Sequence, residues 1–327
     1  MLGFDTSLLL VIILALLFDF SNGWHDSANA IATVVSTRVL SPLAAVLFAA
    51  VLNVFGAFMS TEVAKMIGTG ILDPTLINQT VINSALVGAI VWNQITLSLG
   101  LPSSSSHALI GGMLGAGVAH AGFEAIKIGG IIKVLQAMLF SPFFGFLMAF
   151  GLMVLLGWLF FRTPRAYASK LFKRLQLLSA GFMAFSHGAN DAQKAMGIIT
   201  LALLSGGHID EAEVPGWVIL SCALAMGLGT ATGGWKIIRT LGMRIAKLEP
   251  VHGFAAETGA AVVLMTTAHI GLPVSTTHTI TSAILGQGVV KGFSAVRWGV
   301  TTRILYAWIL TLPCVALFAG ITYLVFS

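Results

Sequence analysis

The chain has 327 residues, of which 57% are hydrophobic and 9% are charged, whereas soluble domains average about 45–50% apolar and about 25% charged residues. This composition excludes an ordinary soluble fold, and two cysteines are too few for a disulfide scaffold. The net charge of +5 is not gathered into a recognisable nucleic-acid-binding module, so no nucleic-acid partner is predicted. The lipid bilayer is the expected surrounding. Long apolar runs without period-two alternation predict membrane helices rather than a β-barrel.

Hydropathy divides the chain into four apolar elements in each half. The first half is predicted to hold a long helix at 7–37, a spanning helix at 42–63, a half-depth hairpin at 82–118 and a proline-containing spanning helix at 128–161. The second half repeats this order at 177–204, 216–235, 255–289 and 299–326. We expect both long helices to break at a polar, glycine-containing turn, and both hairpins to bend where a proline precedes hydroxyl residues.

Two polar motifs occur twice along the chain. Residues 20–30 (FSNGWHDSANA) return 165 positions later as residues 185–195 (FSHGANDAQKA). Residues 100–107 (GLPSSSSH) return 171 positions later as residues 271–278 (GLPVSTTH). Self-similarity of this kind indicates a tandem duplication. The chain is therefore divided into a first repeat at 1–161, a basic linker at 162–176 and a second repeat at 177–327.

The positions of the charged residues predict an orientation. Five basic residues lie in the linker, four lie in residues 236–247 and three lie in residues 291–303, whereas the loop at 208–215 is acidic. Because loops rich in Lys and Arg stay in the cytoplasm, the linker is predicted to be cytoplasmic and both termini outside, in a plasma (inner) membrane. Equivalent segments of the halves then lie on opposite sides. The predicted fold is an all-α polytopic membrane protein with an inverted-topology repeat, broken helices and two re-entrant helical hairpins, which is typical of secondary transporters.

Ionisable side chains within the apolar segments mark a candidate site. Asp26, Asp191 and Lys194 each cost about 2.5–3.5 kcal/mol at mid-helix on insertion scales, so such groups usually face a polar cavity and pair. A structural ion pair is the alternative interpretation. Spacings of three and four residues place each of two trios on one helical face. The trios are Asn22, Asp26 and Asn29 in the first repeat, and His187, Asp191 and Lys194 in the second.

Hydroxyl residues follow the proline of each hairpin, at the start of a half-helix. They are Ser103 to Ser106 in the first repeat and Ser275, Thr276 and Thr277 in the second. Such residues commonly serve only as helix N-caps. Two inverted copies, however, would aim two helix N-termini and their hydroxyls at one point near the midplane, which suits an anion.

The four motif copies, residues 22–30, 187–194, 101–107 and 272–278, resemble those of the inorganic phosphate transporter (PiT) family, and the resemblance covers essentially the whole chain. It implies a cation-coupled phosphate symporter with inverted repeats that is often a homodimer. It also implies that phosphate binds between the helix breaks and the hairpins. The residues implied to line the phosphate site are Asp26, Asn29, Ser104, Ser105, Ser106, Asp191, Lys194, Ser275, Thr276 and Thr277.

The coupling ion is left open between a proton and sodium. Lys194 stands where the usual family motif has Asn, and this variant resembles bacterial low-affinity phosphate transporters thought to use protons. Glu257, by contrast, matches a hairpin residue of sodium-coupled members. Two carboxylates, one ammonium and phosphate leave excess negative charge, so a cation must bind as well. The coupling-ion candidates are Asn22, Asp26, His187, Asn190, Asp191 and Glu257, with His187 preferred for a proton and Asp26, Asp191 and Glu257 for sodium.

Other functions remain as alternatives. A sulfate symporter would use the same hydroxyls and helix ends. A passive anion channel or an intramembrane enzyme that uses the Asp pair belongs to a different class of protein. The sequence carries no metalloprotease, hydrolase or Walker A motif. We therefore predict a transporter, not an enzyme, with no cofactor apart from the co-transported H⁺ or Na⁺.

Overall fold

The computed structural model describes residues 6–327, which form twelve α-helices, three short 3-10 or π turns and no β-strand. The all-α prediction is confirmed. The helices of the first half are α1 (Thr6–Ser36), α2 (Pro42–Ala57), α3 (Glu62–Thr69), α4 (Gln79–Leu99), α5 (Ser105–Ala121) and α6 (Ile128–Leu159). Those of the second half are α7 (Arg165–Ser205), α8 (Gly216–Thr232), α9 (Trp235–Arg239), α10 (Pro250–His269), α11 (Thr276–Val289) and α12 (Trp298–Phe326). The turns are η1 (Gly122–Ala125), η2 (Thr240–Arg244) and η3 (Phe293–Ala295).

The long helices α1 and α7 run without interruption through both polar motifs, so the predicted breaks at these positions are wrong. The motif glycines serve close packing instead. A Cβ atom on Gly23 would overlap the carbonyl oxygen of Met226 in α8, and one on Gly188 would overlap that of Asn53 in α2. Each glycine therefore lets a long helix approach its neighbour at backbone distance.

The breaks occur in the second element of each half. The predicted spans at 42–63 and 216–235 are bent by 71° between α2 and α3, and by 61° between α8 and the α9–η2 segment. Side chains of the long helices stabilise these bends. Gln193 Oε1 accepts the backbone N–H of Val63 at 2.9 Å, and Ser27 Oγ accepts that of Gly234 at 2.6 Å. The polar residues of the motifs thus satisfy backbone groups that the bends free.

The two halves interleave. The hairpin helix α5 packs on α12 of the other half, and α11 packs on α6. Gly111 and Gly145 permit this, because a Cβ atom on Gly111 would lie 2.6 Å from the Leu312 carbonyl oxygen, and one on Gly145 would lie 2.7 Å from that of Thr279. Pro142 and Pro313 lie within continuous helices α6 and α12.

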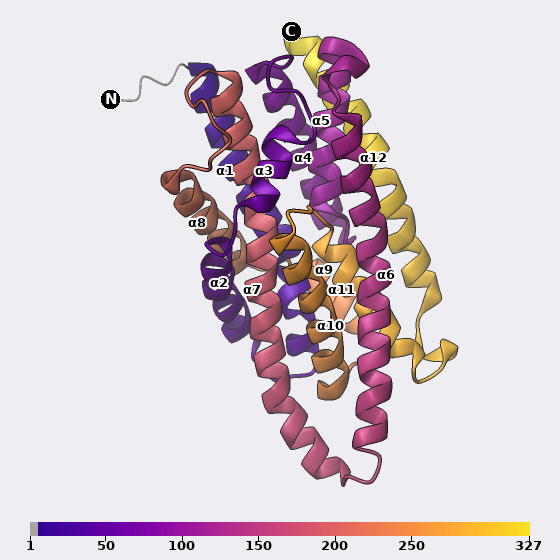
Figure 1. Cartoon of the computed structure of the whole chain (residues 1–327). Helices are drawn as coiled ribbons and strands as arrows, with labels where there is room; N and C mark the ends of the chain where they lie inside the picture. The colour runs from indigo at the N-terminus through magenta and orange to yellow at the C-terminus, as the bar shows by residue number, and fades with distance from the viewer. Residues whose placement is uncertain (1–5) are drawn as a thin grey trace.

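The start of α1 and the end of α12 lie at one end of the bundle, and the turn between α6 and α7 lies at the opposite end (Figure 1). Residues 1–5, and with them the predicted position of the N-terminus itself, lie outside the described residues. Helix α7 begins at Arg165, so most of the predicted linker at 162–176 is helical. Four helices within residues 6–327, namely α1, α4, α6 and α12, are long and apolar enough to cross a membrane, or up to six if each bent pair is one span. Helix α4 was predicted as one arm of a half-depth hairpin, but its 21 residues are enough to cross a membrane. This agrees with a multi-pass membrane protein.

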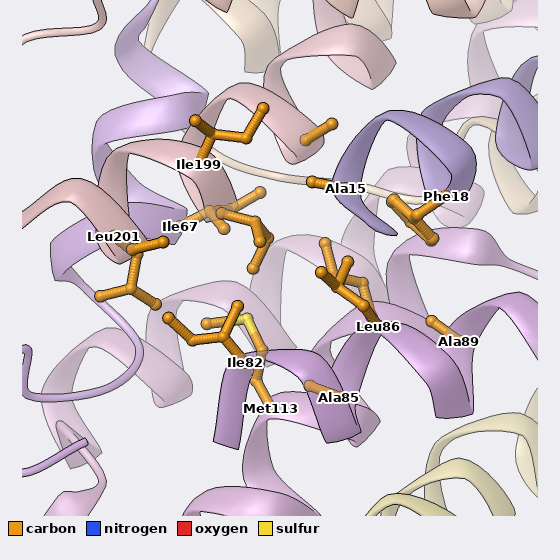
Figure 2. Packing of buried hydrophobic residues seen from close by; sticks show 14 of the residues in the cluster. Ala15, Phe18, Ile67, Ile82, Ala85, Leu86, Ala89, Met113, Ile199 and Leu201 are labelled. Atoms are coloured by element: carbon orange, nitrogen blue, oxygen red, sulfur yellow. The ribbon is translucent and has the colours of Figure 1, made fainter. Parts of the chain in front are cut away.

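Two apolar clusters enclose the polar middle of the bundle. One cluster joins α1, α3, α4, α5, α7 and α8, and includes Phe18, Ile67, Leu86 and Ile199 (Figure 2). The other joins α1, α2, α7, α9, α10 and α11, and begins on α1 at Ala28. The polar stretch of α1 lies between the two clusters, which places its side chains midway along the bundle.

Candidate functional site

The polar faces of α1 and α7 meet between the two apolar clusters. Asn22, Asp26 and Asn29 from α1 and His187, Asp191 and Lys194 from α7 are all at most 1% exposed. Asn22 Nδ2 donates to Asp191 Oδ2 at 3.5 Å, which links the two helices directly. The structure therefore brings together the two trios that the spacing predicted.

An ion pair lies at the centre of this group. Lys194 Nζ is 2.7 Å from Asp191 Oδ1, and both side chains are buried. His187 lies on the other side of the same carboxylate, with Nε2 at 3.5 Å from Asp191 Oδ2. The second ring nitrogen of His187 contacts Asn53 Oδ1 at 3.1 Å. Asp191 thus lies between two basic side chains of its own helix, with His187 one turn before it and Lys194 one turn after it.

The hydroxyls at the start of α5 and α11 contact the two carboxylates. Ser105 Oγ donates to Asp26 Oδ2 at 2.8 Å and to Asn22 Oδ1 at 2.5 Å. Thr276 Oγ1 donates to Asp191 Oδ2 at 3.2 Å, in the corresponding arrangement of the second half. Each hairpin helix therefore begins beside the carboxylate of its own repeat.

Further bonds cross between the repeats at this point. Thr277 Oγ1 donates to Asp26 Oδ1 at 3.3 Å, and Asn29 Nδ2 donates to both Thr276 and Thr277, at 3.2 and 2.9 Å. Ser106 Oγ donates to the Val274 carbonyl oxygen at 2.7 Å, so that the two helix starts are joined to each other. The two helix N-termini and both carboxylates thus share one buried region.

Ser104 and Ser275 are helix N-caps, the alternative that the sequence left open. Ser104 Oγ accepts the backbone N–H of His107, and Ser275 Oγ accepts that of His278, each at 3.1 Å. The rings of these two histidines lie 4.6 Å apart between centroids, and that of His278 stacks on Trp308 at 3.8 Å. These histidines brace the contact between the hairpins.

Glu257 does not join Asp26 and Asp191. It accepts hydrogen bonds from Thr33 at 2.5 Å, from Gln176 Nε2 at 3.1 Å and from Ser179. Thr33 is two helical turns beyond Asp26 in α1, or about 10 Å along the axis. The three-carboxylate sodium set expected from the sequence is therefore not assembled. The described residues instead place ligand atoms of Asp26, His187 and Asp191 within 4.8 Å of one another, which is a set able to hold a metal ion.

Asn190 is also apart from the other candidates. Its side chain is fully buried, and within the described residues neither of its polar atoms has a hydrogen-bond partner. Asn190 was expected to bind the coupling ion, but among the described residues its side chain is not hydrogen-bonded to Asp191 or to any other candidate ligand.

Two titratable residues, one in the site and one near it, were missing from the sequence-based set. His25 Nδ1 lies 2.6 Å from Asp26 Oδ1, and its Nε2 lies 3.0 Å from Thr96 Oγ1. Asp19 is fully buried on α1, where the charges of Asp191 and Lys194 act on it. An acid inside an apolar helix is a functional signal in its own right. Asp19 is not duplicated, because its counterpart in the second repeat is Ala184, and the repeat therefore did not mark it.

Comparisons with known proteins agree with this arrangement. Residues 22–319 match the model of the phosphate transporter family (PHO4). The chain is 49% identical to a probable low-affinity inorganic phosphate transporter of Rhizobium meliloti, over 96% of this chain and 94% of the relative. It is 48% identical to a protein of the same name from Bacillus subtilis, over 98% and 97%. A solved structure of a sodium-dependent phosphate transporter superposes with a TM-score of 0.91 at 25% identity, over 98% of this chain and 99% of that one. The chain belongs to the phosphate transporter family and is a transporter, not an enzyme.

Proposed function

We propose that this chain imports inorganic phosphate together with a coupling cation by alternating access. The observation that carries the proposal is the convergence of two helix starts on two buried carboxylates, with Ser105 of α5 on Asp26 and Thr276 of α11 on Asp191. Helix N-termini and hydroxyl donors are the groups with which proteins bind oxyanions. Phosphate bound there would replace the carboxylates as the acceptor of these hydroxyl protons.

The carboxylates favour phosphate over sulfate, the alternative substrate. Phosphate that retains a proton can donate it to Asp26 or Asp191 in a hydrogen bond. Sulfate offers only acceptors, and an acceptor that faces a carboxylate is repelled. The choice of substrate therefore follows from the retention of buried carboxylates beside the helix starts.

Charge explains the need for a cation. Asp26 and Asp191 together carry a charge of −2 when ionised, Lys194 supplies +1, and phosphate brings about −1 to −2 near neutral pH. A net charge of about −2 to −3 in a region away from water is unfavourable. A co-transported H⁺ or Na⁺ lowers this charge, and Lys194 acts as a built-in substitute for one such cation.

Asp26 and Asp191 are the candidate ligands for Na⁺, because hard cations take oxygen ligands and carboxylate oxygens of these two residues lie within 4.8 Å of each other. The sodium dependence named for the solved neighbour supports sodium as one of the two ions. The ammonium of Lys194 beside Asp191 favours a proton as the coupling ion, because the ammonium already neutralises part of the charge of the carboxylate. Both ions therefore belong to the proposal, and phosphate uptake under a pH gradient or a sodium gradient distinguishes them.

The inverted repeat and the re-entrant hairpins belong to this proposal. Paired packing supports the repeat, since α1 packs on α8 as α2 packs on α7, and α5 packs on α12 as α6 does on α11. Alternating access would rock these pairs about the polar centre. The positive-inside rule then places the α6–α7 turn in the cytoplasm and the opposite end outside, in the plasma membrane. The homodimer implied by the resemblance is part of the same proposal, and cross-linking in membranes tests it.

Uptake of labelled phosphate into proteoliposomes tests the proposal. We expect concentrative uptake under an imposed pH gradient or sodium gradient, with little inhibition by excess unlabelled sulfate. Strong inhibition by sulfate would identify a sulfate carrier. Uptake that never exceeds electrochemical equilibrium would identify a passive channel. Thr322→Val is the matched control for substitutions of the hydroxyl residues Ser105 and Thr276, because the half-buried Thr322 donates its hydroxyl to the Phe318 carbonyl oxygen of its own helix.

A further inference from the structure

Asp19 is a buried carboxyl group with an unusual environment. It is 0% exposed, and within the described residues neither of its oxygens has a hydrogen-bond partner. It precedes Asn22 by three residues and Asp26 by seven, so all three side chains lie on one face of α1. Next to it in the chain, Phe18 belongs to the first of the two apolar clusters (Figure 2).

The titratable groups around Asp19 come from two helices. Asp191 and Lys194 of α7 act on its charge, and Asp19 in turn acts on the thiol of Cys222 in α8. His187 lies on the same helix as Lys194, beside Asp191. Helices α2 and α4, which also pack on α1, contribute no titratable residue. The elements α9, η2, α10 and α11 contact the other half of α1, through bonds such as that from Thr33 to Glu257. Lys194 is therefore the cation whose charge acts on Asp19.

The repeat itself singles out the same two residues. The offset of 165 that relates the first motif copies pairs Asp19 with Ala184 and Lys194 with Asn29. The first repeat thus carries an acid, Asp19, where the second carries neutral Ala184. The second repeat carries a base, Lys194, where the first carries neutral Asn29. These two departures from the repeat are opposite in sign, and they lie within electrostatic range of each other.

An ionised carboxylate without hydrogen bonds is costly inside a protein. A metal cation at Asp19 would need several oxygen ligands, and within the described residues no polar atom is bonded to its carboxyl group. Lys194 is engaged with Asp191 at 2.7 Å. A proton is the cation that needs no further ligand.

We propose that Asp19 is a proton-binding site of the transport cycle, which holds the coupling proton while Lys194 is paired with Asp191. Binding converts the carboxylate to the carboxylic acid, with a proton taken from the outer solution. Release to the inner solution restores a carboxylate, which attracts the Lys194 ammonium and weakens its pairing with Asp191. The inference rests on the proposed phosphate symport and assigns its coupling ion to a residue outside the phosphate site.

Proteoliposomes that contain wild type, Asp19→Asn or Ser21→Ala test this assignment. Two rates are measured for each protein, namely phosphate accumulation driven by a pH gradient and phosphate exchange without any gradient. We expect the ratio of driven accumulation to exchange to fall at least tenfold in Asp19→Asn. Ser21→Ala, a buried neighbour whose hydroxyl is not part of the site, should keep the wild-type ratio.

A wild-type ratio in Asp19→Asn would overturn the inference. Wild-type uptake driven by sodium but not by protons would overturn it as well, and would leave phosphate symport standing. Wild-type protein that transports no phosphate would instead refute the proposed function. If Asp19→Asn does not fold, infrared spectra of wild type and of Asp19→Glu are compared instead. A carboxylic-acid band that shifts in Asp19→Glu supports the inference, and the absence of such a band refutes it.

Discussion

Lys194 Nζ lies 2.7 Å from Asp191 Oδ1, one turn away on the same helix, and neither side chain reaches solvent. This pair fixes the charge at the centre of the bundle, beside the hydroxyl of Thr276 that starts α11. A buried carboxylate stripped of its cation is strongly destabilising, whereas removal of both charges is far less so. The pair therefore links the stability of the fold to the electrostatics of the site.

Lys194→Met should destabilise the protein by about 3–5 kcal/mol, because Asp191 keeps its charge and loses its ammonium partner. The double variant Lys194→Met with Asp191→Asn should recover most of that loss. Thermal unfolding in detergent, read as a double-mutant cycle, measures the coupling. Additive effects of the two substitutions would contradict a direct ion pair.

Ser105→Ala and Thr276→Val should each weaken phosphate binding about 10- to 100-fold, since a hydrogen bond to a charged group contributes about 1.5–3 kcal/mol. Ser104→Ala should mainly lower stability, by about 1 kcal/mol, because its hydroxyl caps α5. Equilibrium binding and thermal unfolding of the three variants separate these roles. Equal loss of phosphate affinity in Ser104→Ala would show that the cap residue also binds the anion.

Gly23→Ala and Gly188→Ala should prevent normal packing of α1 on α8 and of α7 on α2, because an added methyl group would meet backbone atoms. Overpacking of this kind typically costs about 1–3 kcal/mol, and more where backbone must move. Gly157→Ala is the matched control, since nothing lies within 4 Å of its Cβ position. Size-exclusion profiles and thermal unfolding report the result. Normal folding of both motif variants would contradict the close approach.

His25→Ala should reduce phosphate uptake about tenfold, because the ring contacts Asp26 on one side and Thr96 on the other and so holds the carboxylate in place. Thr96→Val should act in the same direction with a smaller effect. The double variant should lose little more than His25→Ala alone, since both substitutions break one chain of contacts. Initial uptake rates in proteoliposomes provide the comparison, and strictly multiplicative losses would argue against a shared chain.

Much of the fold followed from the sequence, and the misses have physical causes. Hydropathy located the long helices α1, α6 and α12, because burial in lipid demands continuous apolar runs. It assigned α4 to a half-depth hairpin, although this helix has 21 residues and is long enough to cross a membrane. The breaks were assigned to the wrong elements because polar stretches that contain glycine favour turns in isolation. In the structure the same glycines allow contact with α8 and α2 and remain helical. Packing between helices therefore outweighed the local preference of these residues for a turn.

The residues of the site that are duplicated in the two halves of the sequence could be predicted. Asp26, Asp191, Ser105 and Thr276 occupy duplicated positions. Spacing placed Asp26 and Asp191 each on one polar helical face, whereas Ser105 and Thr276 were expected at the site from the two inverted helix starts and from the family resemblance. Glu257 could not be separated from them by sequence, because its distance from Asp26 depends on how α10 packs against α7. Asp19 has no duplicate, so the comparison of the two halves gave it no weight.

The most direct test of phosphate binding between the two carboxylates is a structure of the protein determined with saturating phosphate. We predict density for a tetrahedral anion between Asp26 and Asp191, in contact with the hydroxyls of Ser105 and Thr276 at the starts of α5 and α11. Phosphate density elsewhere in the bundle, with these hydroxyls still bonded to the carboxylates, would contradict this assignment.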